Sequence, residues 1–335
     1  MRTFLTLDYE VFFGRETGTV ARSVIEPTDA LVAVARKHGA KLVFFVDAGF
    51  ILRLRAEMVR APRLAADHDA LCRQVQALAG AGHEIQLHIH PHWEDSHWNG
   101  ERWDIDVRRY ALQSFAPAEI QDIVGRYTGV LRELAGPDAA FAYRAGGWVL
   151  QPFARIRDGL LAHGVTVDST VFAGGLSEGA TQPYDFRGAP AKGRWRFDTD
   201  PLVEAPQGPF LEVPIASRTL SPAFFWRLAA AKKLGGARHR AFGDGSALAM
   251  EGGDLARKLT RRSTSVVSLD GYKASFLTRA ADEWRSAGHE DFVAIGHPKA
   301  LTPYSLGRLD DYLSRGVTTA GFETFREPVL ARQAA

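Results

Sequence analysis

Short apolar segments of strand length alternate with helical segments along most of this 335-residue chain. Residues 41–47 contain the apolar run Leu-Val-Phe-Phe-Val and are expected to form a buried strand. Residues 117–134 instead repeat their apolar side chains at helical spacing. Repeated β-α units of this kind fold as a parallel sheet with helices outside it. We therefore expect an α/β fold, and the length of the chain suits a single barrel.

The expected elements follow one another in a regular order until the middle of the chain. Strands are expected at residues 3–8, 41–47, 84–88, 140–144, 165–169, 292–296 and 317–322. Helices are expected at residues 28–38, 62–81, 117–134, 151–163 and 306–313. Residues at about 175–275 break this rhythm, because short β segments lead there into a helix-prone, basic stretch. We interpret this part as a mixed α/β insertion in one domain that spans residues 1–330.

The composition is that of an ordinary globular protein, with 46% hydrophobic and 24% charged residues. The net charge of +2 provides no strong field that would select nucleic acid as a partner. The single cysteine, Cys72, excludes an internal disulfide framework. We recognise no signal peptide and no apolar run of membrane-spanning length, so we expect a cytoplasmic protein.

Three histidines lie within five positions of the segment Gly82-His-Glu-Ile-Gln-Leu-His-Ile-His-Pro-His-Trp93. Neutral imidazole is the commonest side-chain metal ligand. In a strand, His88, His90 and His92 would share one face. If the chain became helical after His88, His88 and His92 would still share a face, whereas His90 would not. We therefore expect His88 and His92 to be ligands, and the role of His90 stays open.

Polar side chains of complementary type follow five of the expected strands. They are Asp8 and Glu10, the histidines from His88 to His92, Arg144, Asp168 and His297. In a barrel these positions meet at the carboxyl ends of the strands, where active sites lie. Glu10, His88 and His92 would give one ion a carboxylate and two imidazoles, with positions left for water and substrate. Asp8 could then deprotonate the attacking water.

The remaining candidate site residues would assist the reaction at that ion. Arg144 would hold the base carboxylate ionised through a bidentate contact. Trp148, after Gly146 and Gly147, would form a wall of the substrate pocket. His297 could act as the general acid that protonates a leaving amine, and Asp168 could hold its imidazole in the required tautomer.

These segments resemble, in the same order, the five motifs of the NodB-type polysaccharide deacetylases, carbohydrate esterase family 4. The matching segments are Thr6-Leu-Asp-Tyr-Glu10, His88-Ile-His-Pro-His92, Arg144-Ala-Gly-Gly-Trp148, Asp168-Ser-Thr170 and Ile295-Gly-His297. The resemblance covers residues of about 3–175 and 290–325, and it implies a distorted (β/α) barrel. One departure is Tyr9, which stands where the family has a metal-binding aspartate, and Glu10 is the natural substitute.

The resemblance also implies roles and an activity. Asp8 would be the base, His88 and His92 metal ligands, Arg144 the tether of the base and His297 the acid. The reaction would be the metal-dependent removal of an N-acetyl group from a sugar. We expect one divalent ion, zinc before cobalt, nickel or manganese.

The expected partner is a carbohydrate. Because no export segment is recognised, we expect a nucleotide-linked or lipid-linked precursor of surface-polysaccharide biosynthesis. The basic insertion would suit a phosphorylated substrate or a peripheral contact with a membrane surface.

Three other interpretations remain open. The same site could hydrolyse another amide, as a deformylase or a cyclic ureide hydrolase. The barrel could bind carbohydrate without catalysis, in which case Asp8→Asn would leave ligand affinity intact. A two-histidine, one-carboxylate iron oxygenase would use the same ligand types, but the β-α alternation disfavours it.

Overall fold

The computed structural model describes residues 1–248, 252–315 and 322–326. The chain divides into two compact units. The first unit consists of Met1–Leu7, Val11–Val43 and Ile215–Ala335. The second unit consists of Asp8–Glu10 and Phe44–Pro214. No helix in the described ranges combines the length and apolar character that crossing a bilayer requires.

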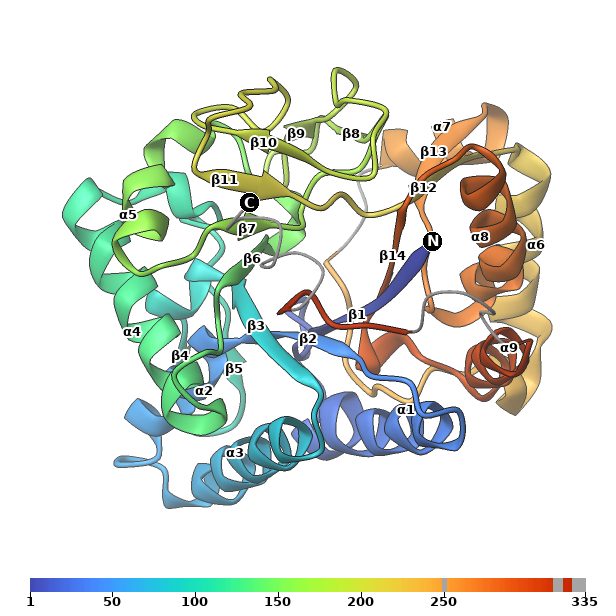
Figure 1. Cartoon of the computed structure of the whole chain (residues 1–335). Coiled ribbons are helices and arrows are strands. Elements are labelled where there is room, and N and C mark those ends of the chain that lie inside the picture. The colour runs from blue at the N-terminus through green and yellow to red at the C-terminus, as the bar shows by residue number, and fades with distance from the viewer. Residues whose placement is uncertain (249–251, 316–321, 327–335) are drawn as a thin grey trace. The chain divides into compact units, whose positions relative to one another are not determined.

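The second unit is built on a mainly parallel sheet in the order β10-β11-β7-β6-β3-β2 (Figure 1). These strands are β2 (Val43–Asp47), β3 (Glu84–Ile89), β6 (Ala142–Ala145), β7 (Val167–Asp168), β10 (Trp195–Phe197) and β11 (Phe210–Glu212). β3 pairs with β6, β6 with β7 and β7 with β11 in parallel, whereas β10 pairs with β11 antiparallel. Every residue of β2 and β3 is buried, as expected for strands covered on both faces.

Helices and short segments complete the second unit. The helices are α2 (Ala48–Glu57), α3 (Ala65–Gly80), α4 (Pro117–Ala135) and α5 (Arg157–Ala162). Two short antiparallel ribbons are β4 (His97–Trp98) with β5 (Trp103–Asp104), and β8 (Leu176–Ser177) with β9 (Tyr184–Asp185). The 3-10 segments are η2 (Pro62–Leu64), η3 (Pro91–Glu94), η4 (Leu112–Ser114), η5 (Gly146–Trp148) and η6 (Phe153–Arg155).

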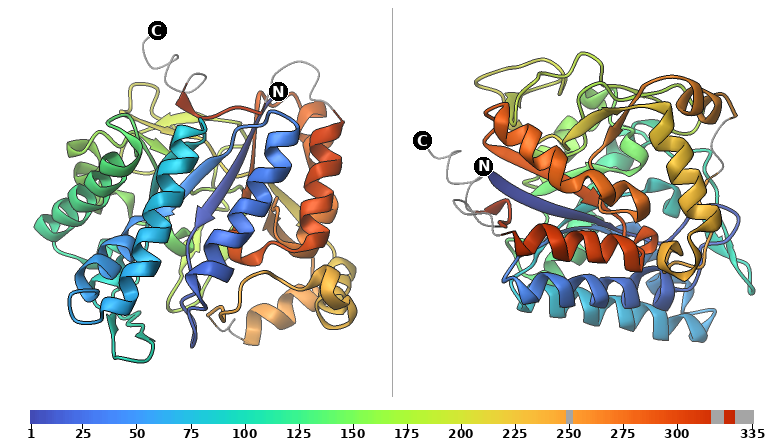
Figure 2. Two further views of the ribbon diagram at one scale, coloured as in Figure 1. Left: turned by 90° about the horizontal axis from the view of Figure 1, so that it is seen from below. Right: turned by 90° about the vertical axis from the view of Figure 1, so that its right-hand side faces the viewer.

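In the first unit, β1 (Arg2–Tyr9) runs parallel to β14 (Asp291–Gly296), with Arg2 opposite Asp291 and Leu7 opposite Gly296. The helices are α1 (Glu26–Lys37), α6 (Pro222–Leu234), α7 (Gly252–Thr260), α8 (Leu277–Ser286) and α9 (Pro303–Ser314). Figure 2 shows α9 alongside α1, where the two helices pack together. β12 (Ser217–Leu220) and β13 (Ser263–Val266) form an antiparallel ribbon. Shorter segments are the π-helical η1 (Ala21–Ile25) and the 3-10 segments η7 (Gly236–His239), η8 (Gly271–Phe276) and η9 (Pro298–Ala300).

The α/β class and the parallel strands predicted from the sequence are confirmed. Helix α2 was not expected, and the helix expected at 151–163 is divided into η6 and α5. Part of the predicted insertion at 175–275 contributes β10 and β11 to the sheet of the second unit. Of the strand expected at 317–322, residues 317–321 lie outside the described residues, and Phe322 forms a β-bridge with Thr3. The single domain from 1 to 330 stays a prediction.

Candidate metal centre

The strands of the second unit end in ionisable side chains. These are Asp47 on β2, His88 near the end of β3, Arg144 on β6, Asp168 on β7 and Glu212 on β11. Asp8 and Glu10, at the end of β1 and just after it, belong to the same unit. All seven side chains are buried. The carboxyl ends of parallel strands lie at one edge of a sheet, so the ionisable side chains that end these apolar strands lie near one another.

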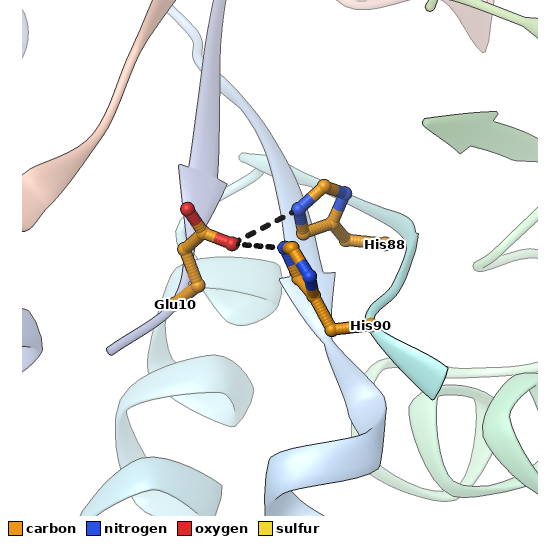
Figure 3. Close-up of side chains that lie close together, drawn as sticks. All are labelled: Glu10, His88 and His90. Carbon is orange, nitrogen blue, oxygen red and sulfur yellow. Dashed lines mark hydrogen bonds and ion pairs between the residues drawn. The ribbon is translucent and has the colours of Figure 1, made fainter. Parts of the chain in front are cut away.

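Glu10, His88 and His90 form a cluster of three potential ligands, which Figure 3 shows. The Oε2 atom of Glu10 lies 3.1 Å from Nε2 of His88 and 2.6 Å from Nε2 of His90. The ligand atoms of the three residues all lie within 4.8 Å of one another. One carboxylate and two imidazoles are a donor set that suits zinc and related divalent ions.

The tautomer of His88 makes this cluster fit a cation. Nδ1 of His88 lies 2.8 Å from the carbonyl oxygen of Arg144 and must donate a proton to it. In a neutral ring, Nε2 then carries a lone pair that faces the carboxylate oxygen of Glu10. Two electron-pair donors at 3.1 Å repel each other unless a proton or a metal ion lies between them. The carbonyl oxygen of Arg144 thus orients the His88 ring so that Nε2 can act as a ligand.

The structure brings His90, rather than the predicted His92, into this cluster. The backbone stays extended through His90 (φ −109°, ψ 90°), and η3 begins at Pro91. His88 and His90 therefore share a strand face, and the backbone turns at Pro91 before it reaches His92. The ring of His92 stacks on Tyr110 with centroids 5.7 Å apart, and its centroid lies 5.4 Å from that of His90. The cluster does not include His92, so a ligand role for this histidine stays a prediction.

The site holds more acidic than basic groups. The carboxyl groups of Asp8, Glu10 and Asp47 lie near His88. Burial opposes the charged form of His88, but these carboxylates outweigh it and raise the pKa of His88 to about 9. Burial likewise raises the pKa of Asp47 to about 7. A cation bound here would relieve the same electrostatic imbalance.

Arg144 contacts Asp8 as predicted, but through one nitrogen only. Its Nη1 donates to Oδ1 of Asp8 at 2.7 Å. Its Nε donates to the Ser169 carbonyl at 2.7 Å and its Nη2 to the Ser169 hydroxyl at 3.1 Å, so the expected bidentate contact is absent from this pair. Oδ2 of Asp8 lies 3.9 Å from Nε2 of His88. Asp8 is therefore fixed by a buried guanidinium beside the candidate ligands.

Asp168 has a different role from the one predicted. Its carboxylate accepts hydrogen bonds from the backbone and hydroxyl of Thr170, at 3.0 and 2.8 Å, and it neighbours Glu212. Burial raises the pKa of Asp168 to about 6, and burial together with the Asp168 charge raises the pKa of Glu212 well above its usual range. Asp168 thus belongs to a buried carboxyl pair that supports the loop carrying Ser169.

His297, in the first unit, is held by Asp270. Nδ1 of His297 lies 2.8 Å from Oδ2 of Asp270, and its backbone N–H donates to Oδ1 at 2.8 Å. Asp270 therefore fills the role assigned to Asp168, and that assignment is corrected. The sequence offered a clue, because Asp270 follows the apolar segment Val266-Val-Ser-Leu269 as other site residues follow strands.

Tyr110 is a neighbour of the cluster that the sequence analysis missed. Its ring lies edge-on to His90, with centroids 5.6 Å apart, and its hydroxyl accepts a hydrogen bond from Gln182 at 2.6 Å. Burial and the charge of Glu10 raise the pKa of Tyr110 well above its usual range, so it stays neutral. Nothing in the surrounding sequence distinguishes this tyrosine, because its contacts are with residues distant along the chain.

The predicted pocket residue Trp148 lies in η5, which follows β6. It is half-buried, has a positive φ of 60° and packs edge-on against Phe172 and Tyr184. A positive φ is costly for a bulky side chain and is typical of functional loops. A pocket role for Trp148 stays a prediction.

No family model matches the chain, and no curated protein matches it. Similar solved structures include a protein from Mycobacterium smegmatis assigned as a polysaccharide deacetylase, with 16% identity and a TM-score of 0.47, covering 99% of this chain and 91% of that one. They also include a polysaccharide deacetylase from Bacillus cereus, with 13% identity and a TM-score of 0.40, covering 97% and 92%. An allantoinase has 14% identity and a TM-score of 0.48, covering 96% and 86%. These similarities concern the fold.

Proposed function

We propose that this chain is a hydrolase that removes an N-acetyl group from a sugar and depends on one divalent ion held by Glu10, His88 and His90. The observation that carries this proposal is the buried ligand cluster beside Asp8, a carboxylate fixed by Arg144. The order of the five sequence motifs supports the choice of a sugar amide. Zinc is the ion we expect first, because it accepts mixed imidazole and carboxylate ligands.

Each residue has a defined task in this reaction. A bound divalent ion would supply Lewis acidity at the amide carbonyl and acidify a water molecule. Asp8, held by a hydrogen bond from Arg144, accepts the proton of the water that attacks the carbonyl carbon. His297, with Nδ1 held by Asp270, delivers a proton from its other ring nitrogen to the departing amine. The C–N bond breaks, and the products are acetate and an amino sugar.

The substrate we propose is an intracellular precursor of a surface polysaccharide. The basic side chains of the first unit support a phosphorylated form of that sugar, whether linked to a nucleotide or to a lipid. A cytoplasmic location follows from the same proposal.

The test is metal content together with acetate release from a panel of N-acetyl sugars, free and nucleotide-linked. Chelation should abolish release, and zinc should restore it. His88→Ala should lose both metal and activity, whereas His97→Ala, which replaces an exposed histidine of the same unit, should keep both. Release of formate, or opening of a cyclic ureide, without acetate release would contradict the choice of amide.

The acid can be tested separately from the metal. His297→Ala should retain the metal and lose roughly 10²–10⁴-fold in kcat, which is the usual contribution of a positioned acid. Asp270→Asn should move the basic limb of the pH profile to lower pH, because it removes the negative charge that favours the protonated ring of His297. Normal turnover by His297→Ala would refute the assignment of the acid.

A further inference from the structure

The helical, basic part of the first unit gathers cations around Lys273. Lys273 lies in η8, and its charge interacts with Asp270 and with two lysines, Lys258 on α7 and Lys232 on α6. Burial, together with the two lysines, lowers the pKa of Lys273 despite the attraction of Asp270. Holding the charges of Lys232 and Lys273 close together is unfavourable unless an anion joins them.

Three cations of this part of the chain are Lys232 in α6, Arg238 in η7 and Lys273 in η8. Asp270 already uses both carboxylate oxygens to hold His297. Within the described residues, Lys232, Arg238 and Lys273 form no ion pair, whereas other cations of this unit, such as Arg279 with Glu283, do. Lys232 and Arg238 are exposed and Lys273 is half-buried, so an anion from solvent can approach them.

A stack of aromatic rings fixes the backbone that carries two of these cations. Tyr304 of α9 stacks on His239 at 4.4 Å and on Tyr272 at 5.9 Å between centroids. The guanidinium of Arg238 lies over the Tyr304 ring, 5.2 Å from its centroid. Residues 236–239 and 271–276 are therefore anchored to α9, which reduces the conformational entropy that a ligand would have to overcome.

We infer that Lys232, Arg238 and Lys273 bind the phosphate or diphosphate group of an activated sugar. Ammonium and guanidinium groups form charge-assisted hydrogen bonds to phosphate oxygens, and a diphosphate can contact several cations at once. The backbone N–H of Lys273 donates to the carbonyl of Asp270, whose side chain holds His297. The phosphate would thus lie close to the proposed general acid. The sugar part of this inference rests on the proposed function, but phosphate binding does not.

The test is calorimetric binding of inorganic pyrophosphate and of uridine diphosphate to the full chain. The wild-type protein should bind at least one of them, more weakly at high salt. Lys232→Gln with Arg238→Gln should raise Kd by about tenfold for each cation removed. The matched control is Lys37→Gln with Arg279→Gln, two exposed, ion-paired cations of the same unit, and its Kd should equal that of the wild type. No binding to the wild-type protein, or equal Kd values for the two double variants, would overturn the inference.

A second experiment distinguishes a lipid-linked phosphate from a nucleotide-linked phosphate. Neutral phospholipid vesicles with and without a polyisoprenyl diphosphate should be compared with uridine diphosphate. Binding that responds to the Lys232 and Arg238 substitutions supports the site in either case and identifies the carrier. If acetate is released from free N-acetyl sugars but no phosphate compound binds, the inference fails while the proposed function stands. If phosphate binds without any hydrolysis, the proposed function fails while the phosphate site stands.

Discussion

Gly146 allows His90 to reach Glu10. A Cβ atom at position 146 would lie 2.5 Å from Nδ1 of His90 and 2.6 Å from the carbonyl oxygen of Ile89. Because the second contact is with backbone, relaxation would displace the end of β3 together with the ring. We expect Gly146→Ala to weaken zinc binding by about 10–100-fold, the usual cost of disturbing the support of a ligand.

Gly129→Ala is the matched control for this substitution. Gly129 lies in α4 of the same unit, and a Cβ there meets nothing within 4 Å. Alanine should keep the zinc affinity and stabilise the helix by about 0.5–1 kcal/mol. Zinc titration against a competing chelator measures the zinc affinity of both variants. Equal affinities would show that Gly146 does not support His90.

Single residues were partly predictable from the sequence. Glu10, His88 and the contact of Arg144 with Asp8 followed from strand ends and residue types. The sequence favoured His92 over His90, because His88 and His92 share a face in either a strand or a helix. The inclusion of His90 in the cluster depends on where the strand ends, and η3 begins only at Pro91. Asp270 follows an apolar segment as other site residues do, but its pairing with His297, like that of Glu212 with Asp168, is a tertiary contact that local sequence does not encode.

At the scale of elements, the 3-10 turn η3 carries the end of the histidine segment and is anchored by α2. Arg53 donates to the carbonyl oxygens of Trp93 and Glu94, each at 2.7 Å. The indole N–H of Trp93 donates to Asp47 at 2.7 Å, and the hydroxyl of Tyr127 donates to Glu94 at 2.9 Å. These bonds hold the turn from three elements.

Removing this anchor should destabilise the fold. We expect Arg53→Met to lower the free energy of unfolding by about 2–4 kcal/mol, because two charge-assisted hydrogen bonds to a part-buried turn are lost. Arg55→Met, on the same helix, removes only a surface pair with Glu133 and should cost about 0–1 kcal/mol. Urea unfolding measures both, and equal losses would mean that Arg53 does not anchor the turn.

The sequence predicted the main helices and strands better than it predicted where they end or which short elements join them. The alternation of apolar strands and amphipathic helices identified β1, β2, β3, α4, β6 and β14 because each buries a continuous or periodic apolar face. Helix α2 was missed because it directly follows the apolar strand β2 without an intervening turn. β10 and β11 are only three residues long each, so their place in the sheet comes from pairing rather than periodicity.

At the scale of the whole molecule, the carboxyl groups around His88 make the free energy of unfolding depend on pH. The pKa of His88 is raised from 6.5 in the unfolded chain to about 9 in the fold. A raised pKa contributes stability that is fully present below pH 6.5 and is lost as pH rises to 9. For the metal-free protein we expect a loss of roughly 3 kcal/mol across this window. Urea unfolding at pH 6.5 and pH 9 measures it, and His88→Gln should flatten the dependence.

The proton on Nε2 of His88 competes with the metal ion for that nitrogen. Zinc requires the unprotonated Nε2 of His88, so binding below pH 9 must release a proton. We expect the apparent zinc affinity to rise about tenfold per pH unit between pH 6.5 and 9 from this group. Calorimetry in two buffers of different ionisation enthalpy counts the released protons. An affinity that does not change over this range would show that zinc does not displace a proton from His88.

The most direct test of the central claim is the zinc content of folded His90→Ala and His92→Ala proteins, prepared side by side and measured by mass spectrometry. We expect His90→Ala to lose zinc and His92→Ala to retain about one ion per chain. Retention by His90→Ala together with loss by His92→Ala would contradict the cluster of Glu10, His88 and His90 as the metal centre.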